Sequence, residues 1–374
     1  MLACKSCELF SEKKEMISAK IGKPRILFND VLPHTTVNGV SISNQINILF
    51  LSEKFTVDIV EEFYDLKHHE VWNFIKITNF LRDLTQILKF SLKYEYSYYY
   101  SSLSLSMFGI IKNILKIFVF KIFNKGKVVL HIHRGDIDLF LDNKINYTLF
   151  SLVRRLTWKI IFLSELQRMK VSRSTKNFVL ENTIEFEYDF TFKTEVSRKV
   201  KFAFISNYIE NKGILILLEA FQSLGEVGID NISLECYGEF TSDILKSQIL
   251  SYESDNISFN KPLSNYEKFL KIYNSDFILL PSFNEGQPLI VLEAMSLGKP
   301  IITTKVGDIP TMLGTDYEFF VEVNSVESLY IKLLEILKNN VKLDGVSSCL
   351  KKRYFENYSR SVHRNKLLKI FEYE

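Results

Sequence analysis

The chain has 374 residues, of which 47% are hydrophobic and 24% charged, with 47 Lys and Arg against 44 Asp and Glu. This length favours two domains with ample core, and the near balance of charge gives no support for a nucleic-acid binder, which needs a concentrated basic face. Four irregularly spaced cysteines favour a reducing compartment over a disulfide framework. Cys4 and Cys7 form a lone CxxC without the second pair that a structural zinc site needs.

The first half of the chain reads as an α/β domain. Residues 1–23 form an expected N-terminal extension without a secretory apolar segment, and residues 1–15, before Met16, are expected to be dispensable. Within residues 24–180 a helix is expected at 40–54, and strands are expected at 25–28, 56–60, 128–132, 160–163 and 178–180. Strands that alternate with helices indicate a parallel, doubly wound sheet.

Between these strands lies a long apolar segment with regularly placed lysines. Met107–Phe123 contains Lys112, Lys116 and Lys121, and the basic character continues to residue 127, so no uncharged run reaches spanning length. The segment predicts a basic amphipathic helix that lies in an anionic membrane interface, or a core-packing helix with a solvated lysine edge. The tyrosines of residues 94–100 favour either an interfacial belt or a strand.

The second half repeats the alternation. Residues 181–200 are charged and form the expected connection between two domains, and residues 181–350 the second domain. One helix is expected at 214–224, and a second begins at the capping box of Ser264 and Glu267 and runs to Tyr273. Strands are expected at 202–205, 232–237, 277–280, 301–304 and 319–323. Residues 351–374 include a final helix, at 354–371.

The most informative segment follows the strand at 277–280. A polar turn leads into a short helix that is expected to open at Pro288, the favoured first helical position, and to end at Gly298. A helix N-terminus suits a phosphate, and Glu285 and Glu293 supply carboxylates for the hydroxyls of a sugar and a ribose. The geometry matches a nucleoside-diphosphate sugar; the alternative is an ordinary βα unit with an exposed Glu.

These residues resemble glycosyltransferase family 4, the retaining enzymes of the GT-B fold. The signature of the family is a Glu, seven residues, a second Glu, Ala-Met and a Gly-x-Pro, and it is matched by Glu285, Glu293, Ala294, Met295, Gly298 and Pro300. The resemblance covers residues 24–372 and implies two Rossmann-like domains that face a cleft. It implies an acceptor domain first, a nucleotide-sugar domain second, and a last helix that crosses back to the first domain.

Further residues acquire roles from this resemblance. Lys212 and Gly213 match the loop that holds the diphosphate, where position 207 is Asn in place of the family's Arg, which puts one phosphate contact in doubt. Gly39, in the loop of residues 34–40, resembles the glycine loop near the donor phosphates; a plain turn explains it nearly as well.

A histidine pair ends the strand at 128–132. His133 resembles the histidine that contacts the donor sugar across the cleft, and alternation places His131 on the same side but deeper. A hydrogen-bonded structural role is the alternative for both, and Arg134 either meets an acceptor phosphate or is a surface charge. Asp136 and Asp138 form an Asp-x-Asp pair that could hold Mn²⁺, but helix capping is the simpler interpretation.

The expected function is a metal-independent, retaining transfer of a hexose-type sugar to a hydroxyl of a cell-surface glycan precursor, such as an O-antigen or capsule. Glu285, His133 and Lys212 are the expected catalytic residues; donor binding is expected from Glu293, Gly286, Gln287, Pro288, Leu289, Asn207 and Gly39. No cofactor is expected beyond the donor substrate, and the location is cytoplasmic, with peripheral membrane contact through residues 107–127. A non-catalytic GT-B partner subunit and a sugar-nucleotide epimerase are the alternatives.

Overall fold

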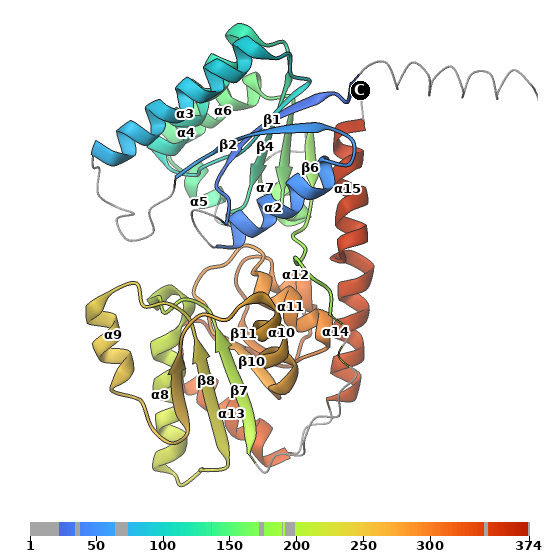
Figure 1. Ribbon diagram of the computed structural model, residues 1–374. Helices are drawn as coiled ribbons and strands as arrows, with labels where there is room; N and C mark the ends of the chain where they lie inside the picture. The colour runs from blue at the N-terminus through green and yellow to red at the C-terminus, as the bar shows by residue number, and fades with distance from the viewer. Residues whose placement is uncertain are drawn as a thin grey trace, which may run out of the picture.

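The computed structural model describes residues 22–33, 38–63, 74–135, 137–171, 176–188, 190, 199–339 and 343–372, which form two α/β units (Figure 1). Within these residues each unit contains one six-stranded sheet whose paired strands are all parallel. The doubly wound architecture predicted from the alternation of strands and helices is therefore confirmed.

The first sheet has the order β2-β1-β3-β4-β5-β6. Its strands are β1 (Arg25–Asp30), β2 (Thr56–Glu61), β3 (Tyr98–Ser102), β4 (Lys127–Ile132), β5 (Lys159–Phe162) and β6 (Asn177–Val179). One face packs on α3 (Phe74–Lys93), α4 (Met107–Phe123), α5 (Ile137–Leu141) and α6 (Lys144–Leu156), and the other packs on α2 (Gly39–Leu51). The short α7 (Glu165–Val171) joins β5 to β6.

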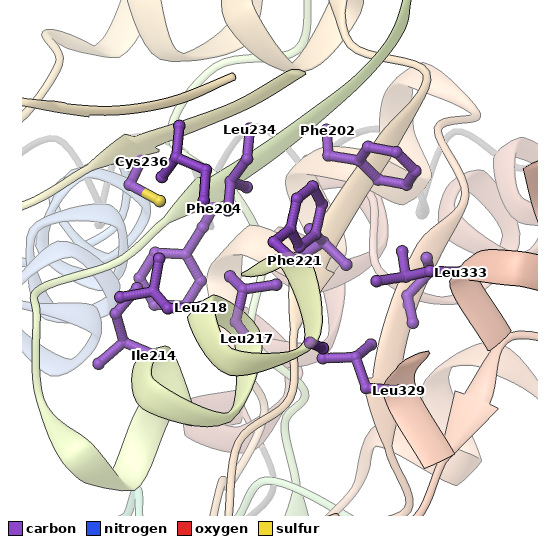
Figure 2. Packing of buried hydrophobic residues seen from close by; sticks show 14 of the residues in the cluster. Phe202, Phe204, Ile214, Leu217, Leu218, Phe221, Leu234, Cys236, Leu329 and Leu333 are labelled. Carbon is purple, nitrogen blue, oxygen red and sulfur yellow. The ribbon is translucent and has the colours of Figure 1, made fainter. Parts of the chain in front are cut away.

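The second sheet has the order β12-β11-β10-β7-β8-β9. Its strands are β7 (Val200–Ile205), β8 (Ile232–Tyr237), β9 (Ile257–Asn260), β10 (Phe277–Leu280), β11 (Ile301–Thr304) and β12 (Phe320–Val321), the last shorter than the predicted 319–323. The helices are α8 (Ile214–Glu226), α9 (Asp243–Leu250), α10 (Asn265–Asn274), α11 (Leu289–Leu297), α12 (Ile309–Leu313), α13 (Val326–Asn339) and α14 (Asp344–Asn357). Figure 2 shows aromatic and aliphatic side chains of β7, β8, α8 and α13 filling one of its two cores.

The topology determines which loops meet. β7 and β10 are hydrogen-bonded neighbours, with Phe202 beside Phe277, although about 70 residues separate them along the chain. The strand order reverses here, and the loops after neighbouring strands leave a parallel sheet at the same edge. Ligands of doubly wound proteins bind at this kind of switch point.

The predicted last helix is two helices. α14 ends at Asn357, and α15 (Arg360–Glu372) follows after Tyr358, whose ψ of −4° leaves the helical region. α15 packs on the first domain, where the hydroxyl of Tyr98 donates to the carbonyl of Phe371 over 2.8 Å. Figure 1 shows α15 running alongside both units, so the expected crossing exists with corrected bounds.

The structure of the first domain bears on two alternatives that the sequence left open, for the tyrosine segment and for the lysine-containing helix. The tyrosine segment forms β3, and Tyr99 and Tyr100 are completely buried, so it is a strand with aromatic partners and not an interfacial belt. α4 forms as predicted, but Lys116 is only 3% exposed and pairs with Glu62 and Asp83. It therefore does not belong to a solvated lysine edge.

Candidate functional site

The motif-bearing segment forms a buried strand, a turn and a buried helix. α11 begins at Leu289, one residue later than predicted, and Pro288 is its cap residue. Proline fixes only φ, here −68°, and the ψ of 129° keeps Pro288 extended. Gly298 ends α11 with a φ of 69°, a left-handed conformation that glycine adopts freely, as predicted.

Lys212 and Glu285 meet at this turn. The Nζ of Lys212 lies 2.7 Å from Oε1 of Glu285, and the hydroxyl of Ser282 donates to the same oxygen over 2.7 Å. Glu285 is 9% exposed, whereas about a quarter of the Lys212 side chain faces solvent. A largely buried carboxylate and a solvent-accessible cation are thus joined at the carboxyl ends of β7 and β10.

Gly213 explains how the lysine reaches the turn. Its φ is 74°, and an added Cβ would lie 2.0 Å from the carbonyl oxygen of Pro281. Only glycine lets the loop after β7 press against the loop after β10 in this conformation. The amide of Phe283 also donates to the carbonyl of Asn211 over 2.9 Å, so the two loops are bonded by their backbones.

Glu293 lies in the body of α11 and has a different partner. It is 4% exposed, and Lys268 of α10 donates to its Oε1. The side chain of Lys268 is 16% exposed, so this pair is largely removed from solvent. Each of the two signature carboxylates is therefore held by a lysine from another element.

The first domain lies directly against the turn. An added Cβ on Gly135 would lie 2.4 Å from the carbonyl oxygen of Glu285, and one on Gly286 would lie 3.0 Å from the carbonyl oxygen of His133. Gly307, with a φ of 54°, approaches the same Glu285 carbonyl from the second domain. We call the place where Lys212, Glu285, Gly286, His133 and Gly135 meet the interdomain site.

His133 and His131 are neighbours within the first domain, with ring centroids 4.0 Å apart, as alternation along the chain requires. The Nε2 atoms of both rings are buried and have no hydrogen-bond partner among the described residues. Burial lowers the pKa of His133 to about 3 and that of His131 well below its usual value, so both rings are neutral near pH 7. His131 takes part in a hydrogen bond with Tyr100, as its structural interpretation predicts.

Gln287 uses its side chain to join the two domains. Its Nε2 donates to the carbonyl of Leu163 over 2.7 Å, and its Oε1 accepts from the amide of Asn182 over 2.8 Å. The side chain of Asn182 donates to the carbonyl of Gln287 over 3.0 Å. The carboxamide of Gln287 is thus occupied by the first domain and the interdomain connection.

The remaining predicted donor residues lie at different distances from the turn. A Cβ on Gly39, the first residue of α2, would lie 4.0 Å from Cγ of Leu289, so these two predicted residues face each other across the domains. Asn207 accepts from the amide of Glu239 over 3.3 Å and lies in the loop of Lys212. Residues 34–37 of the predicted glycine loop lie outside the described residues.

Of the Asp-x-Asp pair the structure describes one residue. Asp136 lies outside the described residues, and Asp138, in the first turn of α5, pairs with Lys170. Across the described part of the chain, no group of three or more His, Cys, Asp or Glu side chains could hold a metal ion. Cys4 and Cys7 also lie outside the described residues.

Sequence reasoning missed several residues of the site. Lys268, Ser282 and Asn182 contact predicted residues, and Gln167 joins the domains by donating to Asp308 over 3.1 Å. Ser282 stands three residues before Glu285, inside the quoted motif, and its hydroxyl was the one available signal. The other contacts depend on tertiary proximity over 25 to 141 positions, which no local pattern reveals.

Known proteins resemble this chain in sequence. An uncharacterized glycosyltransferase of Methanocaldococcus jannaschii is 24% identical over 288 residues, which cover 70% of this chain and 72% of that protein. A putative teichuronic acid biosynthesis glycosyltransferase, TuaC of Bacillus subtilis, is 25% identical over 126 residues, or 34% of this chain and 30% of that protein.

The fold is also shared. The solved structure of Anabaena Alr3699/HepE in complex with UDP superposes with a TM-score of 0.65 at 12% identity, and the match covers 93% of this chain and 99% of that one. Residues 187–358, which contain Glu285, Glu293 and α11, match the family described as glycosyl transferases group 1. This match covers 172 of the 374 residues, the part of the chain that carries the motif, and the fold of the whole chain is GT-B.

Proposed function

We propose that this protein is a retaining glycosyltransferase that moves a hexose-type sugar from a nucleoside diphosphate to a hydroxyl of a cell-surface glycan precursor. The observation that carries the proposal is the pair of Lys212 and Glu285 at the carboxyl ends of β7 and β10, directly before α11. A cation, a carboxylate and a helix N-terminus at a switch point form the chemistry that a phosphorylated sugar requires.

Each group has a defined task in this proposal. Lys212 and the start of α11 stabilise the negative charge that grows on the departing diphosphate. Glu285 and the N–H groups of Gly286 and Gln287 hold the sugar, and Glu293 holds the ribose. Binding of the donor replaces the two lysine contacts of these carboxylates with contacts to the ligand.

The proposed chemical step exchanges one bond at the sugar. The acceptor oxygen bonds to the anomeric carbon as the bond from that carbon to the diphosphate oxygen breaks, and the acceptor proton passes to the leaving diphosphate. Attack and departure on the same face of the sugar retain its configuration. Because Lys212 and α11 provide the positive charge, we propose that the step proceeds without a metal ion, and full transfer in excess chelator is the expected result.

The acceptor is proposed to be a polyprenyl-linked or similar glycan precursor. The name of TuaC places that relative in teichuronic acid biosynthesis, and this supports a cell-surface polysaccharide here. The first domain contributes His133 and Gly135 to the interdomain site, which is where an acceptor bound to that domain meets the donor.

A surface of the first domain supports action at the cytoplasmic face of a membrane. Along α4 one helical stripe of large apolar side chains is exposed, namely Met107, Phe108, Ile111, Leu115, Phe118 and Ile122. We call it the α4 stripe. Among the described residues, no helix is long and apolar enough to cross a bilayer, so the proposed contact is peripheral.

The charges around the α4 stripe favour anionic lipid. α4 packs against both α3 and α6. α3 carries four Lys or Arg, and α4 and α6 carry three each, whereas Asp83 is the one acid in these three helices. Lys116 is buried against Glu62 and Asp83, so the other nine cations supply the excess positive charge of these three helices, in a chain whose net charge is only +3. Apolar side chains beside excess lysine and arginine are typical of surfaces that bind anionic membranes.

One observation favours a second function, a GT-B partner subunit without activity of its own. Asn207 stands where the resembling family has Arg, and its side-chain oxygen accepts from the backbone of Glu239. The loop of Lys212 therefore brings one positive charge in place of two. A partner subunit is expected to bind nucleoside-diphosphate sugars poorly and to leave them intact.

The deciding experiment is a thermal-shift screen of UDP-, GDP- and other activated sugars, followed by measurement of donor turnover. A ligand selective for the folded protein raises its Tm, so one donor class is expected to raise Tm and to be consumed. Glu285→Ala is expected to abolish turnover with its circular dichroism spectrum unchanged. Turnover near that of the wild type in this variant, or no shift with any donor, would refute the transferase proposal.

A further inference from the structure

The first domain has a hollow at the amino ends of β5 and β6, and we call it the basic hollow. Its volume is about 350 Å³, within the usual range for small-molecule sites. Arg154 and Arg155, in the last turn of α6, line it together with Lys176, the residue before β6. Among the described residues that line it, none is Asp or Glu. The basic hollow therefore combines space for a small molecule with three positive charges.

The rest of the wall combines hydroxyl groups with one aromatic ring. Ser151 and Thr157 contribute the hydroxyl groups, and Trp158 contributes its indole. An indole offers an apolar face to the carbon skeleton of a ligand, and hydroxyl groups bond to its polar substituents. Cations, hydroxyl groups and an aromatic ring together suit an anion that carries a small organic group.

Two further cations contact Trp158. The Nζ of Lys159 lies 3.7 Å from the centroid of an indole ring of Trp158, and the Nζ of Lys127 lies 4.5 Å from it. Lys159 is only 5% exposed, and burial together with the charge of Lys127 lowers the pKa of Lys159 to about 8. Like charges thus accumulate around one tryptophan, and an anion in the basic hollow relieves their repulsion.

The basic hollow lies at the opposite end of the first sheet from the interdomain site. β4 begins with Lys127 and ends with Ile132, directly before His133 of the interdomain site, and β5 runs parallel beside it. A parallel strand of six residues spans about 20 Å. A ligand in the basic hollow therefore does not compete with a sugar donor at the interdomain site.

Stabilisation of α6 is the simpler role of Arg154 and Arg155, because cations in the last turn offset the negative end of a helix dipole. That end is equivalent to about half a negative charge. The side chains of Arg154, Arg155 and Lys176 bring three positive charges to the same place. The excess over what α6 requires indicates an anionic ligand.

We propose that the basic hollow binds a phosphate ester, with the phosphate at Arg154, Arg155 and Lys176 and the esterified group against Trp158. The forked guanidinium groups match the oxygens of a phosphate in bidentate contacts. A phosphate that carries two negative charges also offsets the three cations better than a carboxylate does. The binding of a soluble phosphate ester does not rest on the proposed function.

The phosphate ester has two sources, a soluble small molecule or the headgroup of an anionic lipid. α4 and α6 pack on each other, and both lead from the carboxyl edge of the first sheet back to its amino edge. Ile122, which ends the α4 stripe, and Arg155 are therefore in helix turns at the same edge of the sheet. A membrane on the α4 stripe presents lipid headgroups at this edge. The lipid source rests on the proposed membrane contact.

The first arm of the test follows binding of soluble phosphates to the full chain. The sequence has two tryptophans, and Trp72→Phe leaves Trp158 as the one indole, so its emission reports on the basic hollow. Calorimetry provides a second dissociation constant. Titration at physiological salt is expected to saturate with glycerol 3-phosphate, to be weaker with inorganic phosphate and to show no response to glycerol. Equal responses to glycerol and glycerol 3-phosphate would contradict recognition of the phosphate.

Two variants of α6 separate binding from general electrostatics. Arg155→Gln removes a cation of the basic hollow, and Lys144→Gln removes the same charge from the exposed first residue of the same helix. Arg155→Gln is expected to weaken glycerol 3-phosphate binding about tenfold or more, as for one lost charged hydrogen bond, and Lys144→Gln to leave it unchanged. Donor turnover is expected to be equal in both variants. A lower Tm of Arg155→Gln with an unchanged dissociation constant would show that Arg155 only stabilises α6.

The second arm distinguishes the two sources with vesicles of phosphatidylcholine, with and without phosphatidic acid. If a lipid headgroup is the ligand, Arg155→Gln binds the vesicles with phosphatidic acid several-fold more weakly than Lys144→Gln does. If the ligand is soluble, the two variants bind these vesicles alike, and only their affinities for glycerol 3-phosphate differ. Equal behaviour of the two variants in both arms would overturn the proposed site, whether or not the protein transfers sugar.

Discussion

The ammonium group of Lys212 is bonded to Glu285 in the protein without ligand, 2.7 Å from Oε1. The two groups that are proposed to hold the phosphate and the sugar therefore neutralise each other before the donor binds. A complete donor has to separate them, because its diphosphate is proposed to bind Lys212 and its sugar Glu285. A nucleoside diphosphate without sugar is expected to interact with Lys212 alone.

The first prediction uses this difference. In Glu285→Ala the ammonium group of Lys212 loses its competitor, so affinity for the nucleoside diphosphate is expected to stay or to rise while sugar transfer is lost. In Lys212→Ala diphosphate affinity is expected to fall about tenfold or more, as for one lost charged hydrogen bond. Titration calorimetry with the diphosphate measures both. Glu335→Gln, which breaks an exposed pair with Lys332 on α13, is the control and is expected to change neither.

The second prediction concerns the ribose. Glu293 is proposed to leave Lys268 and to accept hydrogen bonds from the ribose hydroxyls. The wild type is therefore expected to bind a nucleoside diphosphate more tightly than its 2′-deoxy analogue. Glu293→Gln is expected to reduce this preference, because a neutral amide is a weaker acceptor than a carboxylate. The ratio of the two dissociation constants is the readout. Glu235→Gln breaks the more exposed pair with Lys271 in the same domain, and a similar loss of preference there would count against the assignment.

The third prediction compares two glycines with the same backbone conformation. Gly213 and Gly228 have φ values of 74° and 76°, but only at Gly213 does an added Cβ meet another atom, the carbonyl oxygen of Pro281 at 2.0 Å. Gly228→Ala is expected to cost only the left-handed strain of about 1–2 kcal/mol. Gly213→Ala is expected to lower Tm further and to weaken diphosphate binding, because the clash with Pro281 moves the loop and carries Lys212 away from the turn before α11. Equal effects in both variants would exclude steric positioning of this loop.

The sequence predicted the fold well because the relevant signals are local. Buried parallel strands are short apolar runs, and β10 and α11 are bounded by proline and glycine within 22 residues. The capping box at Ser264 likewise needs only the residue three positions later. Local patterns define the ends of helices less accurately, and for this reason one predicted helix is in fact α14 and α15.

The partners within the site were not predictable in the same way. Lys268 is one of many lysines on helix surfaces, and nothing in α10 shows that it faces Glu293. The contact of His363 with Asn47 spans 316 positions and joins two helices of different domains. Such pairs follow from the packing of whole elements. The chemistry of the signature residues could be predicted, but the groups that hold them in the absence of a donor could not.

The fourth prediction concerns the α4 stripe. Phe118 is 59% exposed, and Phe118→Asp places a charge in the middle of the stripe without disturbing the core. Sedimentation with vesicles that contain anionic lipid is expected to fall several-fold, because apolar contact is lost and a like charge is added. Ile244→Asp, on α9 of the second domain, changes a side chain that is 85% exposed and is the matched control. Equal binding of both variants, or equal binding to neutral vesicles, would contradict a membrane role for this face.

The last prediction concerns pH and the contact between the domains. Burial raises the pKa of Asp308 from 3.8 to about 6, and Gln167 of the first domain donates to it. The folded state therefore binds this proton more tightly than the unfolded state, so the stability from Asp308 is complete below pH 4 and is lost as pH rises through 6. Asp308→Asn keeps an acceptor for Gln167 but cannot ionise. The Tm of the variant relative to the wild type is thus expected to rise between pH 4 and pH 7, and a pH-independent difference would show that Asp308 does not titrate in this range.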